Sequence, residues 1–151
     1  MNEFGLALLV ALTGWWFSTG VILWLVHRSE RYHRKIFVVS TLIMLLAFYG
    51  VATSVYESTP QSVVLAFCLA LLLWGWLEMG YLMGFITGPR KEACPEGATT
   101  ASRMRLGLST CLWHELTLLV MVGVLVWLSW QQTNQTALWT FTVLWLMRWS
   151  S

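Results

Sequence analysis

The sequence predicts an all-α, polytopic integral membrane protein with four full transmembrane helices and a short or truncated fifth. Of the 151 residues, 58% are hydrophobic and only 11% are charged, which is more apolar side chain than a globule of this length can bury. The charged residues gather in short clusters, and the apolar runs between them are as long as membrane spans. Each helix of a soluble bundle would instead carry a polar face, so the pattern excludes that fold class.

Five apolar runs justify the five helices. The first two contain no charged residue and exceed the roughly 20 residues that cross a hydrocarbon core. Glu78 alone interrupts the third run, and the adjacent His114 and Glu115 interrupt the fourth. The fifth is about 12 residues long before Arg148, whose side chain we expect to extend to the membrane interface. The predicted helices cover residues 4–26, 36–56, 62–87, 106–130 and 136–148, within a single membrane domain over residues 1–151.

The basic residues predict the orientation in a bacterial inner membrane. They lie between the first and second helices, between the third and fourth, and at the end of the fifth, so all of them fall on one side. These residues are Arg28, Arg31, Arg34, Lys35, Arg90, Lys91, Arg103, Arg105 and Arg148. By the positive-inside rule we expect cytoplasmic basic loops and a periplasmic amino terminus, which lacks the features of a cleavable signal peptide. In the first interpretation, the basic clusters only determine the orientation of the chain in the membrane. In the second, they also form a docking surface for anionic lipid or a partner.

Glu78, His114 and Glu115 form the candidate polar cluster. If the third helix ends at Gly88 and the fourth begins after Arg105, Glu78 and Glu115 lie ten residues, or roughly 15 Å, from the cytoplasmic helix ends. This depth is near the bilayer midplane, where an ionisable group is costly unless it faces the protein interior and has a partner. We therefore expect Glu78 within direct or one-water reach of His114 or Glu115, with the remaining residue facing another helix.

Three interpretations of this cluster stay open. In the first, a hydrogen-bonded Glu and His lock two helices together. In the second, His114 is a candidate ligand of a tetrapyrrole such as bacteriochlorophyll. In the third, the residues form a metal or proton-relay site, although Leu118 occupies the second ligand position of an H-E-x-x-H zinc motif and we assign no metal ligands.

Gly80, Gly84 and Gly88 mark a candidate helix-packing surface. Their spacing of four residues lets another helix approach the predicted third helix closely. Packing within the chain is the first interpretation, and packing against a partner subunit is the second.

Several of the 11 tryptophans fall deep within the predicted helices. Tryptophan at such depth usually fills the core of a bundle, although flat aromatic surfaces also suit pigments. The deep residues are Trp15, Trp16, Trp74, Trp76 and Trp113.

Enzyme motifs are absent from the sequence. It contains no phosphate-binding glycine-rich loop, no nucleophile elbow and no aromatic and basic face for nucleic acid. We therefore expect no enzyme activity, no catalytic residues and no nucleic-acid partner.

Five strings resemble the PuhE family of photosynthetic complex assembly proteins from purple phototrophic bacteria. The strings are WWFSTG (15–20), WGWLEMGYLMGFITGPR (74–90), CP (94–95), HEL (114–116) and NQTALWTFTVLWLMR (134–148). They occur in the family's order over nearly the whole chain. The resemblance implies a multi-pass protein of the photosynthetic membrane and brings no established catalytic residues. Members of that family continue beyond the fifth helix, so we expect this sequence to cover part of such a protein.

Two function classes follow. In the first, the chain is a non-enzymatic accessory or assembly protein that acts as a membrane scaffold, with reaction-centre or core light-harvesting subunits and membrane lipid as partners. In the second, it is an intramembrane tetrapyrrole- or metal-binding protein that uses Glu78, His114 and Glu115. The absorption spectrum of the purified protein distinguishes the two classes.

Overall fold

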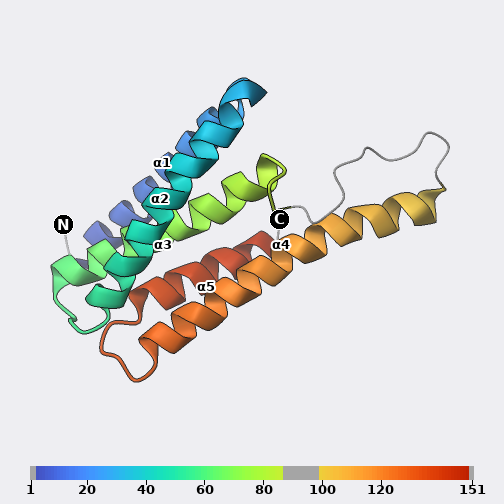
Figure 1. The fold of residues 1–151 in the computed structure, drawn as a ribbon. Helices are drawn as coiled ribbons and strands as arrows, with labels where there is room; N and C mark the ends of the chain where they lie inside the picture. Colours follow the sequence, from blue (N-terminus) through green and yellow to red (C-terminus); the bar gives the residue numbers. More distant parts are fainter. Residues whose placement is uncertain (1–2, 87–98, 150–151) are drawn as a thin grey trace.

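The structure, a computed structural model, describes residues 3–86 and 99–149, and within these ranges it contains helices and no strand (Figure 1). The first four helices are each long and apolar enough to cross a membrane, so they fit a multi-pass membrane protein. The helices are α1 (Glu3–Val26), α2 (Glu30–Ser54), α3 (Pro60–Leu82), α4 (Thr100–Ser129) and α5 (Thr136–Trp149).

Two helices begin six residues earlier than the apolar runs predicted, because an apolar run marks the membrane-spanning part of a helix and not its first turn. α2 begins at Glu30, six residues before the predicted start, since Glu, Arg and Lys are good helix formers. α4 begins at Thr100, again six residues before the predicted start. The hydroxyl of Thr99 caps it by accepting a hydrogen bond from the backbone N–H of Ser102 at 3.3 Å.

α3 ends at Leu82, so the prediction that it continues to residue 87 is wrong. The backbone N–H of Phe85 donates to the carbonyl of Gly80 at 2.8 Å, and that of Gly84 donates to the carbonyl of Tyr81 at 3.0 Å. This pair of bonds is the Schellman motif, which requires a left-handed residue, and Gly84 supplies it with φ of 76°.

The three glycines of the expected packing surface therefore differ in their surroundings, and the expectation is wrong for Gly84. Gly84 lies beyond the helix, and a side chain at this position would strain the turn whatever packs nearby. Gly80 lies within α3, where a Cβ would approach Ile86 of the returning chain to 2.5 Å and the Phe37 ring of α2 to 3.0 Å, so this glycine allows close packing within the chain. Gly88 lies outside the described residues.

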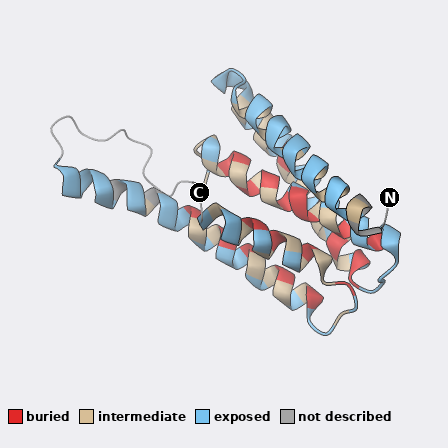
Figure 2. Ribbon diagram, turned by 180° about the vertical axis from the view of Figure 1, so that it is seen from behind, coloured by how far each residue is buried: buried red, intermediate tan, exposed pale blue. Residues whose placement is uncertain are grey.

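α3 is the central helix of the bundle and contacts the other four helices. Its buried residues include steps of one and two between Ala70 and Gly80 and so fall on more than one side of the helix, as expected for a helix with neighbours on several sides. Figure 2 shows buried residues concentrated along α3 and the facing sides of α4 and α5, whereas α1 is largely exposed. The core includes Ala47, Val51, Ala66, Ala70, Leu73, Leu77, Leu118, Met121, Leu125, Ala137 and Phe141.

The loop between α4 and α5 is fixed to the end of α2. The side-chain amide of Asn134 donates to the carbonyl of Ser54 at 3.1 Å, and its backbone N–H donates to the carbonyl of Val55 at 3.1 Å. These bonds satisfy carbonyls that the last turn of α2 leaves without a helical donor. Residues 54 and 134 are far apart in sequence, so this contact holds the first and second halves of the bundle together.

Tryptophans at mid-helix positions do not all fill the core. Trp74 and Trp76 pack against it as predicted. Trp15, Trp16 and Trp113 are instead exposed, so the expectation that they fill the core of this chain is wrong. Because α1 rests on α3 through a narrow stripe, most of its circumference has no neighbour within the described chain.

Candidate functional site

His114 occupies a core position on α4. Among the described side chains of this helix, buried residues follow one another at steps of three and four from His114 onward. The series is His114, Leu118, Met121, Leu125 and Ser129. This face of α4 turns the imidazole toward α3, where it meets Glu78 and Tyr81, although its neighbour Trp113 is exposed.

Glu78 connects α3 to both α4 and α5. Its Oε1 lies 2.6 Å from Nη1 of Arg148, which donates a charge-assisted hydrogen bond. The same oxygen lies 3.5 Å from Nε2 of His114, which is long for a hydrogen bond. The structure therefore brings Glu78 and His114 within the distance expected from the sequence.

Glu115 faces α5. Its Oε2 accepts hydrogen bonds from the indole N–H of Trp145 at 2.9 Å and of Trp149 at 3.3 Å. Its Oε1 lies 3.6 Å from Nε of Arg148, so one guanidinium contacts both carboxylates. Adjacent residues on a helix point about 100° apart, which is why His114 faces α3 while Glu115 faces another helix.

Tyr81 covers the imidazole of His114. The two ring centroids are 4.4 Å apart with an interplanar angle of 33°. The Tyr81 hydroxyl lies 3.7 Å from Sγ of Cys111, and the Arg148 guanidinium lies 5.3 Å from the centre of the tyrosine ring. Tyr81 thus contacts both α4 and α5, and we define the six residues Glu78, Tyr81, His114, Glu115, Trp145 and Arg148 as the polar cluster.

The geometry does not fit ligation of a tetrapyrrole by His114. A ligating nitrogen needs open space in front of it, but the His114 side chain is 0% exposed. Neither ring nitrogen has a hydrogen-bond partner among the described residues, and Tyr81 lies against one ring face. A macrocycle would reach Nε2 only if Tyr81 or Glu78 moved. Residues 3–86 and 99–149 also contain no group of three or more His, Cys, Asp or Glu placed to hold a metal ion.

The end of α3 changes the depth expected for Glu78. With the helix ending at Leu82, Glu78 lies four residues, or about 6 Å, from the helix end instead of ten residues. His114 lies 14 residues after the start of α4, so α4 extends about 15 Å further than α3 at this end. Figure 1 shows this extension of α4 beyond the rest of the bundle.

Sequence reasoning missed that Arg148 is the counterion. We expected its side chain to extend to the interface, but the guanidinium is directed to Glu78 and Glu115 and is 25% exposed. The available signal was that Arg148 is the one charged residue of the fifth apolar run, while two carboxylates elsewhere lacked a cation. Trp145 and Trp149 gave no such signal, since tryptophans at helix ends are usually interfacial.

Comparisons with known proteins show the family. The family described as "Protein of unknown function (DUF3623)" matches residues 1–151. A Rhodobacter capsulatus protein described as "Uncharacterized 30.4 kDa protein in puhA 5'region" is 36% identical over 155 aligned residues, which are 98% of this chain and 56% of that protein. The chain therefore spans little more than half the length of this curated relative. No solved structure is significantly similar to the chain. The chain belongs to the DUF3623 family.

Proposed function

We propose that this chain is a non-enzymatic accessory or assembly protein of a bacterial photosynthetic complex. The gene of its Rhodobacter capsulatus relative lies in the puhA 5' region, which gives a photosynthesis-related context. The resemblance to the PuhE family points the same way and suggests reaction-centre or core light-harvesting polypeptides as partners.

One structural observation carries the proposal of a scaffold. Trp16 and Trp24 on α1 are 76% and 59% exposed, and we call these two residues the α1 aromatic face. Trp16 lies ten residues, or about 15 Å, from the end of α1, deeper than the interfacial belt where exposed tryptophan is usual. Large rigid aromatics are frequent anchors of protein interfaces. The α1 aromatic face therefore suits contact with a helix of another membrane protein.

The polar cluster supports a structural role over a chemical one. Its carboxylates are bound by Arg148 and by indole N–H groups, and its imidazole is closed off from open space. Charged groups that satisfy one another between helices hold those helices in register.

The first test removes the gene from a phototrophic host. We expect membranes without the protein to contain much less intact reaction-centre and core antenna complex, measured by near-infrared absorption and density-gradient fractionation. Wild-type protein supplied in trans should restore the complex. Normal amounts of complex in the deletion strain would contradict the proposal.

Two matched variants locate the surface. Trp16→Ala and Trp127→Ala each remove an indole that is about equally exposed, at 76% on α1 and 75% on α4. We expect Trp16→Ala to lower the yield of complex and Trp127→Ala to leave it unchanged, with both variants present in the membrane. The opposite result would place the contact on α4.

The proposed orientation places the basic loops in the cytoplasm. The described chain alternates in direction, so the ends of α1, α3 and α5 and the starts of α2 and α4 lie at one end of the bundle (Figure 1). We expect green fluorescent protein fused after Arg34 to fluoresce and alkaline phosphatase fused after Gln132 to be active. The reverse pair of activities would overturn the orientation. The alternative fusion site at Ala98 lies outside the described residues.

A further inference from the structure

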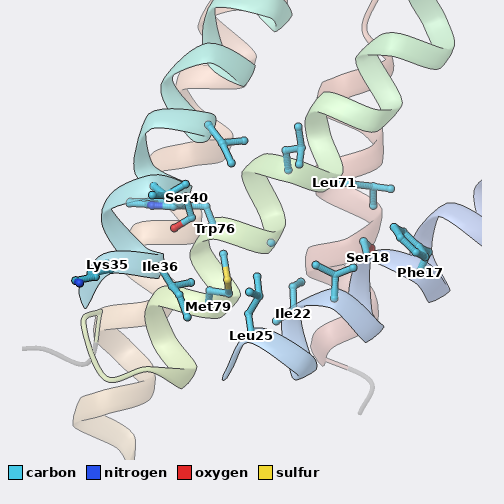
Figure 3. Close-up of a pocket in the computed structure, with 15 residues that line it drawn as sticks. Phe17, Ser18, Ile22, Leu25, Lys35, Ile36, Ser40, Leu71, Trp76 and Met79 are labelled. Atoms are coloured by element: carbon cyan, nitrogen blue, oxygen red, sulfur yellow. The ribbon is translucent and has the colours of Figure 1, made fainter. Parts of the chain in front are cut away.

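A cavity of about 570 Å³ lies between α1, α2 and α3. α1 and α2 both rest on α3 and contact each other much less, so a groove remains between them with α3 as its floor. Ile22 on α1 and Gly75 on α3 meet at the floor, where a Cβ added to Gly75 would lie 3.2 Å from Ile22. Figure 3 shows lining side chains converging from all three helices.

The lining of this groove suits a hydrocarbon ligand. The polar side chains in the lining already have partners, because the hydroxyls of Ser18 and Ser40 donate to backbone carbonyls of their own helices. The indole N–H of Trp76 donates to the hydroxyl of Thr41 at 2.9 Å. The remaining lining is almost entirely apolar. A ligand whose polar atoms had to be buried here would find few free hydrogen-bond partners.

One end of the groove is positively charged. Lys35 is the charged residue of the lining, and Figure 3 shows its amino group at the edge, away from the other lining side chains. This arrangement lets the alkyl stem cover apolar surface while the ammonium reaches the interface. Arg31 and Arg34 lie within the same first turns of α2, opposed there by Glu30. The rim thus attracts an anion beside an apolar groove.

We propose that the groove binds one anionic phospholipid, with an acyl chain along α3 and the phosphate beside Lys35. The volume agrees, since cavities that hold small ligands span about 300–1,000 Å³. The proposal does not depend on the role in photosynthesis.

Native mass spectrometry of the delipidated protein in detergent, titrated with dioleoylphosphatidylglycerol or dioleoylphosphatidylcholine, tests the proposal. We expect one phosphatidylglycerol per chain, bound more tightly than phosphatidylcholine. Lys35→Gln should weaken phosphatidylglycerol binding about fivefold and leave phosphatidylcholine binding unchanged. Arg105→Gln on α4, which does not line the groove, is the charge-matched control and should change neither.

Ile43→Trp should fill the groove and abolish the bound lipid. The matched control is Leu46→Trp on the same helix, because Leu46 is 71% exposed and lies outside the lining. Val39→Phe is a second blocking variant at a more exposed lining position, and circular dichroism and gel filtration check the fold of each variant.

Three results would overturn the proposal. Equal affinity of the wild-type chain for the two lipids would remove the charge argument. Unchanged phosphatidylglycerol binding by folded Ile43→Trp or Val39→Phe would place the lipid elsewhere. Loss of a co-purifying membrane polypeptide from these variants, with lipid binding intact, would make the groove a protein-docking surface.

Discussion

Arg148→Gln is expected to lower the free energy of unfolding by about 2–3 kcal/mol. The variant would leave Glu78 and Glu115 without the guanidinium that contacts both carboxylates. Breaking a fully buried ion pair costs about 3–5 kcal/mol, and the exposure of Arg148 and Glu78, 25% and 16%, reduces the expected loss. Titration of the detergent-solubilised protein with SDS, followed by tryptophan fluorescence, measures the change.

Two controls separate the ion pairs from a general loss of charge. Arg34→Gln removes an exposed cation from α2 and should change stability by no more than about 0.5 kcal/mol. The triple variant with Gln at positions 78, 115 and 148 leaves no charge unpaired and should recover most of the loss. If Arg148→Gln alone were as stable as the wild type, the ion pairs would not hold the bundle together.

His114→Ala is expected to destabilise the protein by about 2–4 kcal/mol, because it empties a fully buried position beside Glu78 and Tyr81 of α3. His114→Phe keeps a ring against Tyr81 and should lose no more than about 1.5 kcal/mol. Trp113→Ala, at the adjacent and exposed position, should cost less than His114→Ala. The same SDS titration ranks the three variants.

The absorption spectrum of these proteins tests the rival function. A purely structural His114 predicts a colourless wild-type protein and identical visible spectra for the Ala and Phe variants. A visible band in the wild type that disappears in both variants would show that His114 ligates a pigment. The intramembrane tetrapyrrole-binding function would then replace the assembly role.

The sequence predicted the helices well where hydropathy decides and poorly where other forces do. Four apolar runs predicted the four long helices, because the number of consecutive apolar residues reflects the thickness of the hydrocarbon core that a helix must cross. The end of α3 depends on the left-handed backbone conformation of Gly84. The spacing of the glycines every four residues was instead interpreted as a packing surface on a continuous helix. The first turns of α2 and α4 consist largely of polar residues, and a search for apolar runs does not detect such turns.

The candidate site was predicted in part. The cost of a charge within an apolar run identified Glu78, His114 and Glu115 as residues that need partners, and the structure brings Glu78 beside His114, although Glu78 lies nearer its helix end than predicted. The partner Arg148 could not be assigned, since its distance in sequence from Glu78 is bridged only by the packing of α5 on α3. The exposure of Trp16 likewise depends on which face of α1 meets α3, and a helix that is apolar on every side does not specify that face.

The ion pairs of Arg148 also bear on the order in which the chain is made. Synthesis proceeds from the amino terminus, so Glu78 and Glu115 emerge from the ribosome before the arginine that compensates them. During that interval α3 and α4 carry carboxylates without a counterion, and moving such groups into lipid is unfavourable. We therefore expect both helices to stay beside the translocon or near the aqueous boundary until α5 is made. Arrival of α5 ends the interval, because its last turn delivers the guanidinium together with two indole donors. We therefore expect α3 and α4 to settle in the bilayer only after α5 has been made.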